Sequence, residues 1–135
     1  MTPQAVVVDT NVVSYLYRAD PLAAPFKLAR ESRRRLISFQ TLAELLVWAE
    51  PWTEPKRIKL ERWILARFGV LPHTPVVTRA WVLAVTSARR NGFPISTGDA
   101  WIAASAMSAG LMLLSADQHD FRGVDDLKLF TPPST

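Results

Sequence analysis

Short apolar runs alternate with segments of helical periodicity along the whole chain. An unbroken apolar run bounded by polar residues is typical of a strand buried on both faces, and such runs predict strands at 4–8, 36–39, 70–71, 111–114 and 127–130. The segments between them predict helices at 12–18, 22–34, 41–50, 54–68, 75–90 and 100–109. Because strands that alternate with helices form right-handed crossovers, the pattern predicts an α/β domain with a central parallel sheet of four to five short strands.

Local signals mark the ends of several of these segments. Either Thr10 or Asn11 is expected to cap the first helix, because a side-chain oxygen there accepts a hydrogen bond from a free backbone N–H. Gly69 is expected to end the helix at 54–68, and Gly110 the helix at 100–109. These signals support the division of the chain into short strands and helices.

The composition is that of one globular domain with an ample core. The chain has 135 residues, 49% of them hydrophobic, and we expect a single domain over 1–135 with a short flexible C-terminal tail at 131–135. The uncharged stretch 100–116 contains serines and a glycine, which favours a buried helix followed by a strand over a membrane span. The sequence has no cysteine, which suits a reducing cytoplasm. No basic region precedes the first apolar run, and that run is too short for a signal peptide, so we expect a cytoplasmic protein with no membrane partner.

Basic residues outnumber acidic ones, and they gather in two places. The formal net charge is +4 and the pI is about 10.0, which favours a polyanionic partner such as nucleic acid. The first cluster either complements the dipole at the end of the helix at 22–34 or faces phosphate. The second lies on the amphipathic helix at 54–68, which is either a solvated surface helix or a nucleic-acid contact. The candidate backbone contacts are Arg33, Arg34, Arg35, Lys56, Arg57 and Arg62.

Four acidic residues fall where predicted strands end or predicted helices begin. Asp9 and Asp117 follow buried strands, and Glu44 and Asp99 lie in the first turns of helices that follow a strand or loop. In a parallel sheet the strand ends and the following helix starts share one edge, where α/β folds bind their ligands. We therefore expect the four carboxylates to converge on one crevice.

Each of these carboxylates also has a purely structural explanation. Asp9 would serve as a helix cap, and Asp117 suits an Asx turn. Thr41 and Glu44 have the spacing of a capping box, and Asp99 forms the aspartate version with the serine three positions before it. Taken singly, these explanations are as good as a functional one. Taken together, they do not explain why every acid falls at the same edge.

The chemistry of a carboxylate cluster points to a hard divalent cation. Carboxylates that lie close together repel one another and take up protons unless a cation is present. Mg²⁺ or Mn²⁺ prefers carboxylate oxygens, keeps several waters and bridges to phosphate, and such an ion can activate an attacking water. The absence of cysteine and the presence of only two histidines, His73 and His119, disfavour zinc. Acids, a hard cation and a basic surface together indicate phosphodiester hydrolysis.

Four motifs, in order along the chain, resemble the successive motifs of PIN-domain nucleases. The resemblance is closest to the VapC-type toxins of bacterial toxin–antitoxin pairs. The motifs are Val6–Asn11, Thr41–Leu45, Gly98–Ala106 and Leu113–Phe121. They span nearly the whole chain, and the first and third are the most specific.

The resemblance implies a PIN-like α/β/α sandwich and a Mg²⁺- or Mn²⁺-dependent endoribonuclease that acts as a toxin. It implies that Asn11 holds the first acid by hydrogen bonds and that Thr10 or Thr97 contacts the bound water or phosphate. An RNA substrate, a homodimer and a small antitoxin that blocks the site are also implied. The residues to which it assigns metal ligation and catalysis are Asp9, Glu44, Asp99 and Asp117.

The last motif departs from the family's pattern. Many members have a threonine, any residue, and then an aspartate or asparagine, whereas this chain has Ser115, Ala116 and Asp117. Asp120 is therefore an alternative to Asp117 as the fourth acid, although it lies three residues further along the chain.

Other functions fit the sequence less well. Haloacid-dehalogenase-like phosphatases need a second aspartate two residues after the first, where this chain has Asn11. Receiver domains need an acidic pair just before the site, whereas the adjacent acids here, Asp125 and Asp126, come near the end. A PIN-like module that binds RNA or protein without cutting it is the remaining alternative, and the complete acid set favours the enzyme.

Overall fold

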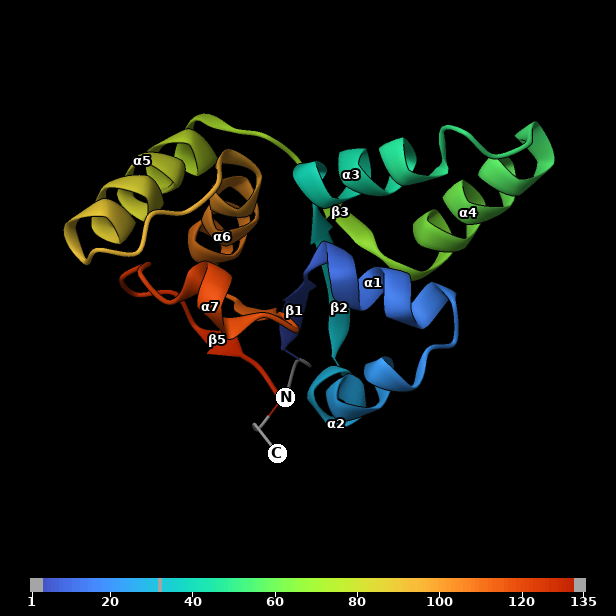
Figure 1. The fold of residues 1–135 in the computed structure, drawn as a ribbon, viewed down its shortest axis with the longest axis horizontal. Helices are drawn as coiled ribbons and strands as arrows, with labels where there is room; N and C mark the ends of the chain where they lie inside the picture. The colour runs from blue at the N-terminus through green and yellow to red at the C-terminus, as the bar shows by residue number, and fades with distance from the viewer. Residues whose placement is uncertain (1–3, 32, 133–135) are drawn as a thin grey trace.

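A five-stranded parallel sheet forms the centre of the protein (Figure 1). The computed structural model describes residues 4–31 and 33–132. The strand order is β3-β2-β1-β4-β5, with every neighbouring pair parallel, so the first strand lies in the middle. The strands are β1 (Ala5–Val8), β2 (Arg34–Ser38), β3 (Gly69–Leu71), β4 (Met112–Leu114) and β5 (Leu129–Phe130). The predicted α/β fold with a parallel central sheet is confirmed.

Helices cover both faces of this sheet, as Figure 1 shows. Helices α1, α2, α3 and α4 lie on one side, and α5, α6 and α7 lie on the other. The helices are α1 (Thr10–Tyr17), the 3₁₀ helix η1 (Pro21–Phe26), α2 (Lys27–Arg30), α3 (Phe39–Ala49), α4 (Glu54–Arg67), α5 (Pro75–Arg90), α6 (Thr97–Ala109) and α7 (Gln118–Phe121). In the part of the chain that the structure describes, no helix is both long and apolar enough to cross a membrane.

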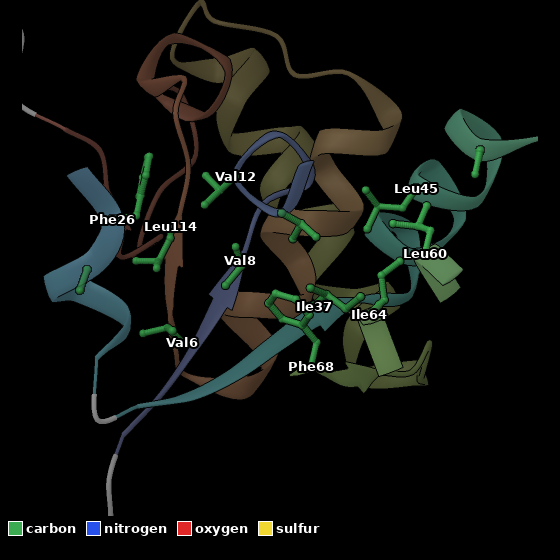
Figure 2. Close-up of a cluster of buried hydrophobic side chains, with 13 residues drawn as sticks. Val6, Val8, Val12, Phe26, Ile37, Leu45, Leu60, Ile64, Phe68 and Leu114 are labelled. Atoms are coloured by element: carbon green, nitrogen blue, oxygen red, sulfur yellow. The ribbon is translucent and has the colours of Figure 1, made fainter. Parts of the chain in front are cut away.

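Strand β1 divides the hydrophobic core into two layers, because successive side chains of a strand point to opposite faces. Val6 and Val8 pack into the layer that includes residues of α1, α3 and α4, which Figure 2 shows in close-up. Val7, between them, packs into the layer beneath α5 and α6. All three valines are buried, so β1 is fixed from both sides and the residue that follows it has a well-defined position.

The segment between α1 and β2 differs from the single helix predicted at 22–34. It forms η1 and the four-residue α2, and β2 already begins at Arg34. Pro25 lies inside η1, and a proline there removes a backbone donor and disfavours α-helical geometry in the residue before it. Arg34 and Arg35 therefore belong to a strand and not to a helix C-terminus, so the dipole explanation offered for them was wrong.

Several helix ends are also displaced by a residue or two from the predicted ones. Asp9, and not Thr10 or Asn11, is the N-cap of α1. Gly69 lies in β3, because α4 ends one residue earlier at the extended Phe68. The end of α6 agrees with the prediction, since Gly110 adopts a left-handed conformation with φ of 67°. The short helix α7 was not predicted. Of the predicted flexible tail at 131–135, residues 133–135 lie outside the described residues, and both the tail and the single domain over 1–135 stay predictions.

Candidate active site

The carboxyl ends of the central strands meet at one edge of the sheet and bring acidic residues together. Val8 pairs with Leu114 in the sheet, and the Asp9 backbone N–H donates to the Leu114 carbonyl over 2.9 Å. Asp9 directly follows β1, and Asp117 follows β4 by three residues. Asp99 lies in the first turn of α6, whereas Glu44 lies in the second turn of α3 and not in the first as predicted.

Asp9 is the most deeply placed of these acids, with 6% of its surface exposed. The Ser115 hydroxyl donates to its Oδ2 over 2.8 Å, and the Thr10 backbone N–H donates to Oδ1 over 2.8 Å. Ser115 is itself buried and also accepts a hydrogen bond of 3.1 Å from the backbone N–H of Asp117. A single hydroxyl group thus links the acid after β1 to the backbone of the acid after β4.

Glu44 is held by side chains from two elements. Its Oε1 accepts a 2.7 Å hydrogen bond from the Thr10 hydroxyl, and its Oε2 accepts one of 2.8 Å from the Gln40 side-chain amide. A Cβ atom at Gly98 would lie 3.0 Å from Glu44 Oε2, so the start of α6 approaches Glu44 closely. This approach places Asp99, the next residue, beside the acids of the other elements.

The structural explanations for these acids are partly right. Ser96 caps α6 by accepting from the Asp99 backbone N–H over 3.2 Å, and Asp117 Oδ1 accepts from the His119 backbone N–H over 2.9 Å, as in an Asx turn. The capping box proposed for Thr41 and Glu44 is wrong. Ser38 is the N-cap of α3, and Thr41 is buried within the helix. Capping and convergence on one edge therefore coexist at Asp99 and Asp117.

Burial and the charges of neighbouring carboxylates raise the pKa values of Asp9 and Asp99. The pKa of Asp9 rises from 3.8 to about 6, mainly because burial disfavours the charged form, with smaller contributions from the carboxylates of Asp99 and Glu44. The hydrogen bonds from Ser115 and Thr10 oppose this rise. The pKa of Asp99 is also raised, first by burial and then by the charges of three other acids, Asp120, Glu44 and Asp117. The carboxylates therefore lie within electrostatic range of one another.

Asp120 belongs to the same charged neighbourhood. Burial and the adjacent Asp117 carboxylate raise its pKa, and it is the first of the charged groups that raise the pKa of Asp99. Its side chain is exposed, whereas that of Asp117 is half-buried. The choice between Asp117 and Asp120 as the fourth acid therefore stays a prediction.

The donor set suits a hard divalent cation, although the side chains are not yet arranged around one. Within residues 4–31 and 33–132, no three acids or histidines stand close enough together to hold a metal ion as they are. The available donors are carboxylate oxygens, which Mg²⁺ and Mn²⁺ prefer. Moreover, a buried carboxylate with a raised pKa is one whose charge a cation would stabilise. The acids therefore fit such an ion by the chemistry of their donor atoms.

Most of the predicted supporting and basic residues lie outside this cluster. Asn11 is exposed, and the hydrogen bonds to Asp9 in the described chain come from Thr10 and Ser115 instead. The Thr97 carbonyl accepts from the Trp81 indole over 3.4 Å, and the Thr97 residue is exposed. The contact predicted for Thr97 with bound water or phosphate is not tested by these interactions.

The first of the two basic clusters lies at the edge of the sheet opposite to the acids. Arg34 and Arg35 stand opposite Ala5 and Val6 in the sheet register, which is the edge away from the carboxylates. Arg33 precedes this strand, and its guanidinium donates to the Ala29 carbonyl. Lys56 and Arg62 are exposed on α4, and Arg57 is half-buried and donates to backbone carbonyls. The structure therefore separates the first cluster from the acidic edge.

Ser115 is the functional position that the sequence analysis missed. It was treated as a departure from a motif, whereas its hydroxyl is the side chain that hydrogen-bonds to Asp9. A signal was present: a hydroxyl residue directly after a buried strand, at the edge where the acids gather. Its partner could not be identified, because the two residues are 106 positions apart in the sequence.

Replacing Ser115 with alanine should impair the site without removing an acid. The substitution Ser115→Ala takes away one hydrogen bond to a buried carboxylate, which should raise the pKa of Asp9 further and lower cation affinity about 10–100-fold. Titration of the cation, followed by intrinsic tryptophan fluorescence, would measure this change. Ser115→Thr keeps the hydroxyl and should retain most of the affinity. Equal losses in the two variants would contradict a role for the hydrogen bond.

Comparison with known proteins gives relatives over nearly the full length. The family model described as PIN domain matches residues 6–127. The Haemophilus influenzae protein named Ribonuclease VapC2 is 29% identical over 123 residues, which cover 90% of this chain and 93% of that protein.

Solved structures of similar fold agree with this match. The structure of FitAcB from Neisseria gonorrhoeae superposes with a TM-score of 0.80 at 26% identity and covers 95% of this chain and 98% of that one. A second is VapBC-5 from Mycobacterium tuberculosis, described as a member of the VapBC family of toxin-antitoxin systems. It has a TM-score of 0.72 at 24% identity and covers 98% of this chain and 100% of that one. The second likeness concerns the fold alone.

Proposed function

Because the chain belongs to the PIN-domain family, we propose that it is a divalent-metal-dependent endoribonuclease and the toxin of a toxin–antitoxin pair. The observation that supports this most is the set of carboxylates from separate elements at one edge of the sheet. The charges of Glu44, Asp99 and Asp117 each raise the pKa of another acid in the set. The ribonuclease name of the Haemophilus influenzae relative agrees with this chemistry.

In this proposal Asp9 is the central ligand for Mg²⁺ or Mn²⁺, and Glu44, Asp99 and Asp117 complete the set. A bound ion of this kind would supply an activated water and neutralise charge on the leaving oxygen. The chain's own part is to hold the Asp9 carboxylate in place through Ser115 and the Thr10 backbone. The Thr10 hydroxyl donates to Glu44, and in this proposal it would also contact phosphate or water beside the bound ion.

The partners of this enzyme are part of the proposal. The substrate is RNA, and a cognate antitoxin covers the acidic edge, as the resemblance of the four motifs to VapC-type toxins implies. A homodimer in the cytoplasm is the assembly and location that we propose. An antitoxin that neutralises the clustered carboxylates with a basic side chain would relieve the same repulsion that a metal ion relieves.

Cleavage of total cellular RNA by the purified full-length chain tests the proposed function. Discrete fragments are expected in the presence of Mg²⁺ or Mn²⁺ and not in the presence of EDTA. If a folded, antitoxin-free protein produces no metal-dependent fragments from any RNA fraction, the proposal is wrong. The chain would then be a PIN-like module that binds RNA or protein without cutting it.

A further inference from the structure

Two neighbouring hollows, of about 290 Å³ and about 340 Å³, lie between α1, α3 and the start of α4. The first is lined by Thr10, Asn11, Ser14, Arg18, Leu45 and Trp48. The second is lined by Tyr17, Trp52, Lys56 and Lys59. We call these two hollows together the α1–α4 groove.

One end of this groove opens at the proposed active site, and its two hollows share a wall of aromatic rings. Thr10 lines the first hollow and donates to Glu44 over 2.7 Å. The ring centroids of Trp48 and Trp52, one from each hollow, are 4.8 Å apart. Tyr17 lies 6.4 Å from Trp48 and is stacked with Trp52 at 6.5 Å. The contacts between these rings therefore place the second hollow beside the first.

The groove carries positive charge. Arg18, Lys56 and Lys59 line it, and the described lining residues include no aspartate or glutamate. Arg18 forms an ion pair of 3.8 Å with Asp20, and the two side chains are 50% and 27% exposed. Such surface pairs are weak and easily exchanged. Lys56 and Lys59 are exposed, and among residues 4–31 and 33–132 neither forms an ion pair. All three cations are thus available to an anionic ligand.

Hydrogen bonds from Arg57 hold the loop that carries Trp52. The Arg57 guanidinium donates to the carbonyls of Glu50 and Trp52, each over 3.1 Å. This arginine is therefore a support of the groove and not one of its free cations. Because the loop is held, the position of the Trp52 ring relative to Lys56 is set before any ligand arrives.

We propose that the α1–α4 groove binds one single-stranded flank of the RNA next to the scissile phosphate. Single strands are bound by a basic track that follows the phosphates and by aromatic rings on which the bases stack, and the groove offers both along one path. Arg18, Lys56 and Lys59 contact the phosphates, and the rings of Trp48 and Trp52 meet the bases. This inference rests on the proposed function, because it assigns the groove to the substrate of the same site.

Binding of fluorescein-labelled polyadenylate and polyuridylate to the full-length protein in EDTA tests this proposal. Lys56→Gln with Lys59→Gln should weaken binding on the order of tenfold and lower the slope of log affinity against log salt by about 1.4, since each phosphate contact on a single strand contributes about 0.7. The matched control is Arg79→Gln with Arg89→Gln, which removes the same charge from exposed positions on α5 and should leave the slope unchanged.

Each outcome of this experiment supports or overturns the proposed binding of RNA in the α1–α4 groove. A loss of affinity and slope confined to the lysine variant supports the proposal. Equal effects in the two variants would show a general charge effect and overturn it. An unchanged RNA affinity in the lysine variant, or no RNA binding by the unaltered protein, would also overturn it and leave the groove to a protein partner. Because no divalent cation is present, this binding result is independent of whether the protein cleaves RNA.

Discussion

Asp9→Asn is expected to abolish RNA cleavage while leaving the protein folded. Asp9 is the most deeply buried of the proposed ligands, and an amide cannot supply the negative charge that holds a divalent cation. Loss of the several kcal/mol that such an ion contributes to the transition state corresponds to about a thousandfold or more in rate. Cleavage of total RNA at saturating Mg²⁺ would measure the effect.

Asp126→Asn is the matched control for this substitution. Asp126 is exposed and has φ of 63°, a conformation that asparagine tolerates well. The control removes the same negative charge from an exposed position outside the proposed ligand set and should cleave RNA at the rate of the unaltered protein. If Asp9→Asn retained more than about a tenth of the rate, Asp9 would not be the central ligand.

The metal-free protein should lose stability as the pH rises from about 4 to about 7. The pKa of Asp9 is about 6 in the folded protein, against an ordinary value of 3.8 for an aspartate in the unfolded chain. Within this window the folded state therefore retains a proton that the unfolded state has released, and the free energy of unfolding must fall with increasing pH. The difference between a pKa of 3.8 and one of about 6 corresponds to roughly 3 kcal/mol of stability, which is fully lost once the pH exceeds the folded pKa.

Thermal unfolding in EDTA at several pH values would measure this loss, with Asp9→Asn as the reference. The variant has no ionisable group at the position, so it should lack this part of the pH dependence and should be more stable than the unaltered chain near neutral pH. Mg²⁺ should restore much of the stability of the unaltered protein and little of that of the variant. Parallel pH profiles for the two proteins would contradict the raised pKa of Asp9.

The strand ends were the part of the site that the sequence could predict. A buried run such as Val6–Val8 that ends in Asp9 identifies a central strand and the residue at its carboxyl end, because burial on both faces leaves the run no polar position. The topology of parallel sheets then brings Asp9 and Asp117 to the same edge. This argument needs only local patterns, and the structure agrees with it.

The hydrogen-bond partners of the acids could not be predicted in the same way. The contacts of Ser115 with Asp9 and of Thr10 with Glu44 join residues 106 and 34 positions apart, and no local pattern specifies such pairs. The segment at 22–34 was mistaken for one helix because its apolar spacing is helical, whereas Pro25 and the pairing of Arg34 with Ala5 impose other geometry. Tertiary contacts decided the structure at these positions.

The central place of β1 in the sheet has a consequence for protein synthesis. Strand β1 can complete its pairing only with β4, which the ribosome makes after β2, β3 and the helices between them. The hydroxyl that holds Asp9 belongs to Ser115, still later in the chain. The chain must therefore emerge through β4 and Ser115 before the acidic edge can assemble. A nascent chain that stops before this segment would carry the Asp9 carboxylate without the hydroxyl that holds it and without the acid that follows β4, so the proposed site forms only after β4 has been made.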